Sequence, residues 1–247
     1  MNKKHTDIVV AAYGWQYPDW NESFYPEDLP EDWRLSFYSN EFRAVVVPAS
    51  VWVGDDPLDA ERWVEDVSDE FTFYLEVVDI LADWVKISAA AKPFGKKLAG
   101  ILLRPVALDA DLAMIASSLD AATALAPVCL LLPEKMELSE TGNSLLLEQG
   151  VSVCWDTAKG VPVWSQGGFA VARVANNMEC TPRQWREIIE QCLRCEIVGE
   201  PENEVSTEAG AGIKRKVLLM VEHKSLNLDS LRAAMMIGDM LVVPRID

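Results

Sequence analysis

Short runs of apolar residues recur along the whole chain at intervals that suit an alternation of strands and helices. Most of the runs are continuous rather than alternating, and several are rich in Val and Ile, as is typical of parallel strands covered on both faces. The eight runs are residues 8–12, 44–49, 71–78, 100–106, 128–132, 151–155, 169–175 and 217–221. The pattern therefore predicts eight buried parallel strands.

Apolar residues at helical spacing lie between these runs, and five helices are predicted, at residues 32–42, 57–67, 109–125, 181–192 and 225–241. Eight strands interleaved with helices predict one α/β domain over residues 1–247, a TIM-like (β/α)8 barrel. The third and sixth connections are expected to be irregular. A doubly wound open sheet is the alternative, but the bulky residues that follow the first strand do not suit a dinucleotide-binding turn.

One segment, residues 196–212, is acidic, contains glycine and has few large apolar side chains. Such a composition does not bury enough apolar surface to offset the entropy lost on ordering. We expect a flexible insertion there.

Charge and hydropathy limit the partners and the compartment. The chain has 22 Lys and Arg against 39 Asp and Glu, a net charge of −17, which disfavours nucleic acid and anionic membrane surfaces. The apolar run at 8–12 is too short for a signal peptide, and no run approaches the roughly 20 residues of a membrane span. Together with an odd number of cysteines, 5, this predicts a cytoplasmic protein with reduced thiols.

Aromatic residues crowd the segment directly after the first run, where residues 13–25 contain six of them. Large rigid side chains with polar tips suit either a binding mouth or a structural clasp. The segment resembles the opening of the YecE-like family, domain of unknown function 72. The matching residues are Gly14, Trp15, Tyr17, Trp20, Phe24, Tyr25, Pro26, Leu29 and Pro30. The resemblance implies a TIM-like barrel.

Several strand ends depart from the pattern of that family. The family tends to carry polar groups after the second, third, fifth and eighth strands. At those places this chain has Val46 and Pro48, Glu76 and Asp79, the apolar stretch 129–132, and Glu222 with His223. The chain thus resembles a divergent member that kept the scaffold and the aromatic entrance.

Chemistry is expected at the carboxyl ends of the strands, where TIM-barrel enzymes place their sites. The catalytic candidates are His223, Asp156 and Glu222, since an imidazole can shuttle a proton that a carboxylate orients. The ligand-binding candidates are Trp15, Tyr17, Asp19, Glu76, Arg104 and Arg173. A purely structural alternative is that His223 caps a strand end while Arg173 and Asp156 form an ion pair.

Other groups of residues give weaker indications of a functional site. The chain has only two histidines, His5 and His223, so no ordinary zinc cluster is expected, and no cofactor is expected either. Cys192 and Cys195 lie at i and i+3 in helical spacing, at and just beyond the end of the predicted helix, and are interpreted as core thiols. Glu76 and Asp156 could act as paired carboxylates on a sugar.

Two functions remain open. The first is a non-catalytic or weakly catalytic scaffold that binds a small ligand or a protein partner through an aromatic mouth. The second is a hydrolase or lyase that acts on a small anionic or sugar-like substrate with His223, Arg173 and acidic residues. The first predicts that polar groups at the mouth satisfy one another, whereas the second predicts that His223 faces Arg173 and a carboxylate. The missing polar residues at the strand ends favour the first.

Overall fold

The computed structural model describes residues 6–53, 60–105, 112–133, 138–160, 169–175, 180–194 and 215–242. The predicted insertion at 196–212 and the residues His5 and Cys195 lie outside these ranges.

Nine parallel strands form one nearly closed barrel in the order β6-β5-β4-β3-β2-β1-β9-β8-β7. They are β1 Thr6–Tyr13, β2 Ala44–Val47, β3 Thr72–Val78, β4 Leu98–Arg104, β5 Val128–Leu130, β6 Ser152–Val153, β7 Trp155–Asp156, β8 Phe169–Ala175 and β9 Arg215–Glu222. Only Cys154 separates β6, which pairs with β5, from β7, which pairs with β8. The two therefore act as one interrupted strand, and the eight predicted strands and the TIM-like barrel are confirmed.

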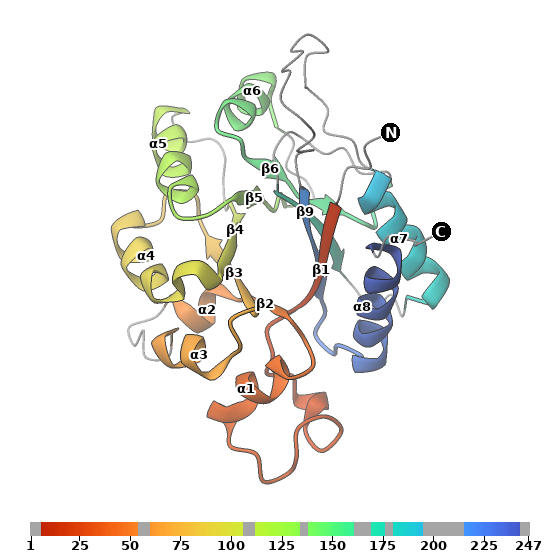
Figure 1. The fold of residues 1–247 in the computed structure, drawn as a ribbon. Helices are drawn as coiled ribbons and strands as arrows, with labels where there is room; N and C mark the ends of the chain where they lie inside the picture. Colours follow the sequence, from red (N-terminus) through yellow and green to blue (C-terminus); the bar gives the residue numbers. More distant parts are fainter. Residues whose placement is uncertain are drawn as a thin grey trace, which may run out of the picture.

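Helices surround the barrel (Figure 1). They are α1 Arg34–Ser39, α2 Ala49–Trp52, α3 Ala60–Asp66, α4 Trp84–Ala91, α5 Leu112–Thr123, α6 Glu140–Glu148, α7 Pro182–Arg194 and α8 Leu228–Val242, with 3-10 turns η1 Pro18–Trp20, η2 Glu31–Trp33 and η3 Lys92–Lys97. The five predicted helices are present as α1, α3, α5, α7 and α8. Within the described ranges, no helix combines the length and apolar character needed to cross a membrane.

The third connection is more regular than expected. The Asp83 side chain accepts hydrogen bonds from the backbone N–H groups of Val85 and Lys86 and so begins α4 as an N-cap. The helix escapes sequence detection because Ile87 and Ala91 are its only buried residues. Irregular backbone occurs at Asp79, whose φ is 79°, and in η3, which is kinked at Gly95. The described part of the sixth connection, residues 157–160, contains no helix.

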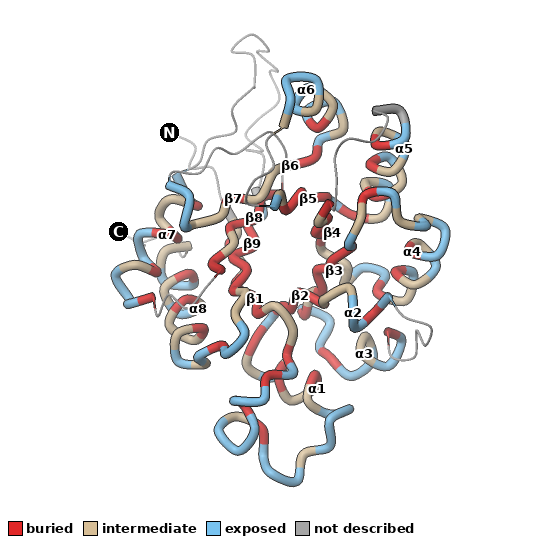
Figure 2. Tube along the Cα trace, turned by 180° about the vertical axis from the view of Figure 1, so that it is seen from behind, coloured by how far each residue is buried: buried red, intermediate tan, exposed pale blue. Residues whose placement is uncertain are grey.

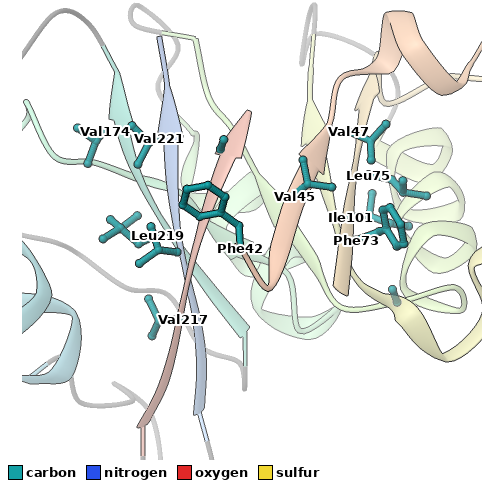
Figure 3. Close-up of a cluster of buried hydrophobic side chains, with 14 of the residues drawn as sticks. Phe42, Val45, Val47, Phe73, Leu75, Ile101, Val174, Val217, Leu219 and Val221 are labelled. Carbon is teal, nitrogen blue, oxygen red and sulfur yellow. The ribbon is translucent and has the colours of Figure 1, made fainter. Parts of the chain in front are cut away.

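The apolar core has two layers, one inside the barrel and one between the sheet and its helices. Successive side chains of a strand point to opposite faces, so Leu218 and Met220 of β9 lie inside while Val217, Leu219 and Val221 lie outside. Figure 3 shows the outer set, and Figure 2 shows that the ring of strands is buried almost throughout. This alternation decides which residues reach the inner rim.

The interior of the barrel needs a glycine at one place. The rings of Tyr74 and Phe169 stack with their centroids 5.8 Å apart. A Cβ at Gly100 would lie 2.8 Å from the Phe169 ring and 3.1 Å from Tyr74. Gly100 therefore leaves the space that this aromatic pair fills.

The aromatic segment after β1 is a packed clasp, formed by Trp15, Tyr17, Trp20, Phe24 and Tyr25. Its polar tips bond to backbone: the Trp20 indole N–H donates to the Leu226 carbonyl at 2.6 Å, and the Tyr25 hydroxyl donates to the Trp15 carbonyl at 2.6 Å. Trp15 and Tyr17 are buried. Of the two interpretations of the aromatic segment, this burial favours the structural clasp over the binding mouth.

Trp20→Ala should destabilise the fold by about 3 to 5 kcal/mol, because it removes a fully buried ring and its hydrogen bond to Leu226. Trp33→Ala is the matched control, since the Trp33 ring is 59% exposed and its loss should cost less than about 1 kcal/mol. Urea unfolding measures both. Equal midpoints for the two variants would show that the clasp does not stabilise the barrel.

The five tyrosines predict a loss of stability at alkaline pH. Burial raises the pKa of each above its ordinary value of about 10, and raises that of Tyr74 to about 12. The unfolded chain therefore loses these protons first, and stability present below about pH 10 should fall above it by about 1.4 kcal/mol per pH unit per tyrosine. Urea midpoints at about pH 9 and about pH 11 measure the fall. Tyr38→Phe should make it shallower, whereas a flat profile would contradict the burial argument.

Candidate functional site

Six side chains from six strands form a continuous chain of ion pairs and hydrogen bonds at the carboxyl end of the barrel. We call this set the charged mouth. It runs from Tyr13 of β1 through Glu76 of β3, Arg104 of β4, Glu222 of β9 and Arg173 of β8 to Asp156 of β7. Carboxylates and guanidinium groups alternate along it.

Glu76 is the most buried member, with its side chain only 4% exposed. One oxygen accepts hydrogen bonds from the Tyr13 hydroxyl at 2.5 Å and from the Ala49 backbone N–H at 3.1 Å. The other accepts from Arg104 Nε at 2.8 Å. A buried carboxylate is tolerated when it is paired and hydrogen-bonded in this way.

Arg104 connects the two sides of the mouth. Its Nε bonds to Glu76, while its Nη2 lies 3.2 and 3.3 Å from the two carboxylate oxygens of Glu222. Burial by itself would lower the pKa of Arg104, but the negative charges of Glu222 and Glu76 outweigh burial and raise it. Arg104 is therefore a fixed cation.

Glu222 lies between the two arginines. Its Oε2 accepts a hydrogen bond from Arg173 Nε at 2.6 Å in addition to the contact with Arg104. Arg173 Nη1 lies 3.7 Å from Asp156 Oδ2, which is an ion pair but not a hydrogen bond. The ion pair that we considered between Arg173 and Asp156 is therefore present, as one link of a longer chain.

Strand alternation positions these residues. Tyr13 follows Val9 and Ala11 on the inner face of β1, and Glu222 follows Leu218 and Met220 on that of β9. Each charged residue thus extends an inward row of apolar side chains to the rim. Sequence analysis missed Tyr13 as a site residue, although counting alternate positions from Ala11 would have found it.

Two predicted residues, His223 and Asp19, lie in a different place. Both line a cavity of about 1040 Å³, which we call the side hollow, beside the start of α8. The Ser225 backbone N–H donates to His223 Nδ1 at 2.9 Å, and the Ser225 hydroxyl donates to Asp19. The side hollow also contains Ser225, Asn227 and Ser230, which were not predicted.

The predicted residues therefore separate into three groups. The structure brings Glu76, Arg104, Asp156, Arg173 and Glu222 together in the charged mouth. It places His223 and Asp19 in the side hollow, and it buries Trp15 and Tyr17 in the clasp. His223 therefore lies in the side hollow, whereas its neighbour in sequence, Glu222, lies in the charged mouth.

Among the described residues, the cysteines Cys129, Cys154, Cys180 and Cys192 form no disulfide, and Cys129, Cys180 and Cys192 are buried. A hydrogen bond with Cys129, together with burial, raises the pKa of the Cys154 thiol. Within the ranges that the structure describes, His, Cys, Asp and Glu form no group suited to hold a metal ion.

Fold and site together define a TIM-type α/β barrel whose mouth carries a chain of paired charges. The sequence model of the family described as "Protein of unknown function DUF72" matches residues 9–242. The chain belongs to this family, which confirms the resemblance carried by the aromatic segment. No curated protein matches it.

Solved structures agree with the fold. A DUF72 family protein from Enterococcus faecalis is 13% identical, with a TM-score of 0.62 over 97% of this chain and 99% of that one. A DUF72 family protein from Thermotoga maritima is 14% identical, with a TM-score of 0.59 over 95% and 99%. D-psicose 3-epimerase from Clostridium cellulolyticum is 10% identical, with a TM-score of 0.52 over 94% and 97%. At such identities the likeness establishes the fold alone.

Glu76→Gln should destabilise the fold by about 3 to 5 kcal/mol, because an amide cannot satisfy three donors and leaves Arg104 without one of its anions. Glu187→Gln, on the exposed surface of α7, is the control and should cost less than about 1 kcal/mol. Urea unfolding at neutral pH measures both. A Glu76→Gln variant as stable as the control would contradict the structural role of the buried pair.

Proposed function

We propose that this DUF72 barrel binds a small polar molecule at its charged mouth and does not turn it over. The aromatic clasp contributes stability to the barrel and does not contact the ligand. The odd number of cysteines, 5, suits reduced thiols and therefore also supports a cytoplasmic location.

One observation supports this proposal most directly: the five charged groups of the mouth are already paired with one another. A general acid or base needs a proton that it can exchange near neutral pH, with the reacting atom within hydrogen-bond reach. Glu76 and Glu222 instead accept from guanidinium groups, whose protons do not leave at neutral pH. Such a chain orients donors and acceptors in advance, which favours binding.

The alternative, an enzyme that uses His223 with Arg173 and acidic residues, receives less support. His223 lines the side hollow with Asp19, whereas Arg173 bonds to Glu222 in the mouth. Proton transfer between the side hollow and the charged mouth would require a rearrangement of the segment after β9.

The experiment measures thermal stabilisation against a panel of neutral sugars, polyols, amino acids, carboxylates and phosphates. The proteins are wild type, Arg173→Gln and His223→Ala. We expect at least one compound to stabilise wild type and His223→Ala equally, because His223 lies outside the mouth. Arg173→Gln should weaken the effect, because it removes a mouth donor.

The same mixtures, followed by proton NMR over a day, report turnover. We expect the stabilising compound to remain unchanged. Product formation by wild type that disappears in His223→Ala would reject the non-catalytic proposal in favour of the enzyme. Stabilisation that survives Arg173→Gln would place the ligand elsewhere.

A further inference from the structure

The balance of charge in the mouth limits the kind of ligand that can bind. Three carboxylates, from Glu76, Asp156 and Glu222, face the two guanidinium groups of Arg104 and Arg173. The sum is one negative charge, within a chain whose net charge is −17. An anionic ligand would be repelled both by the mouth and by the field of the whole protein.

Glu222 also occupies the place that an anionic ligand would need. Its carboxylate takes a hydrogen bond from Arg173 Nε at 2.6 Å and contacts Arg104 Nη2 at 3.2 Å. A ligand carboxylate or phosphate that paired with both arginines through these donors would compete with Glu222 for them. It would have to displace Glu222 and leave that carboxylate, only 22% exposed, without its cations.

Hydroxyl groups fit the chain without displacing any member. A hydroxyl donates one hydrogen bond and accepts two, so it can donate to a carboxylate while it accepts from a guanidinium. The 3.7 Å separation between Arg173 Nη1 and Asp156 Oδ2 offers such a place, because the two atoms are too far apart to bond directly. Both side chains are partly exposed, at 23% and 19%.

We infer that the mouth takes an uncharged polyhydroxylated ligand, a sugar or a polyol, and that Glu222 is the residue that selects it against anions. This inference rests on the proposed function. A zwitterionic amino acid is the nearest rival, since it carries both charges. Its carboxylate, however, would compete with Glu222 for the same guanidinium groups.

The test uses isothermal titration calorimetry on wild type, Glu222→Gln and Glu187→Gln. Glu187→Gln is matched in charge, because it removes one carboxylate from the exposed pair with Arg183 on α7. The probes are D-glucose, D-xylose, D-fructose and myo-inositol as neutral compounds, phosphate and citrate as anions, and glycine and glutamine as amino acids.

We expect wild type and Glu187→Gln to bind at least one neutral probe more tightly than any anion or amino acid. Glu222→Gln should bind that probe about tenfold more weakly and citrate or phosphate about tenfold more tightly, because the arginines lose their internal counter-ion. Unchanged selectivity in folded Glu222→Gln would overturn the role of Glu222.

Tighter binding of an anion or an amino acid by wild type would overturn the ligand class while the proposed function stands. Binding of no probe would contradict the proposed function itself, so the two failures are distinguishable. The comparison of neutral, anionic and amino-acid probes on wild type needs no variant. It therefore decides the ligand class even if circular dichroism shows that Glu222→Gln does not fold.

Discussion

The buried carboxylate of Glu76 joins successive parts of the barrel rim. It accepts from Tyr13 at the end of β1, from Ala49 at the start of α2 and from Arg104 at the end of β4. Because a carboxylate so little exposed is tolerated only with its partners in place, these three segments must keep their positions together. Through Arg104 the same constraint extends to Glu222 and onward to the far side of the mouth. The charged mouth is therefore a structural element as well as a candidate binding site.

The aromatic clasp and the charged mouth both begin at the carboxyl end of β1. Tyr13, the last residue of β1, points into the mouth, whereas Trp15, Tyr17 and Trp20 pack outside the barrel. The bond from Trp20 to the Leu226 carbonyl ties the segment after β1 to the segment before α8. This joins the first and last strand-helix units where β1 and β9 already pair. Trp15, Tyr17, Trp20 and Tyr25, which carry part of the family resemblance, are buried and so contribute to the stability of the barrel.

The mutual pairing of the charged groups in the mouth has consequences for function. The donors and acceptors of the mouth bond to one another and so hold defined positions before any ligand binds, which reduces the conformational entropy that binding costs. The same pairing occupies carboxylate oxygens of Glu76 and Glu222 with hydrogen bonds from guanidinium groups. These properties favour recognition of a polar uncharged molecule. The side hollow with His223 and Asp19 is a separate feature with its own polar lining.

The sequence by itself determined the barrel, because eight apolar runs separated by helical stripes leave few ways to bury that surface. It also identified five of the six mouth residues, Glu76, Arg104, Asp156, Arg173 and Glu222, because strand ends are visible as the places where apolar runs stop. Only the tertiary structure decided their partners, since Arg104 and Glu222 are 118 positions apart and meet only when β4 and β9 face each other in the barrel. The tertiary structure also places His223 outside the mouth and buries Trp15 and Tyr17. Sequence alone does not decide this, because the direction of a side chain depends on the face of the sheet and the packing around it.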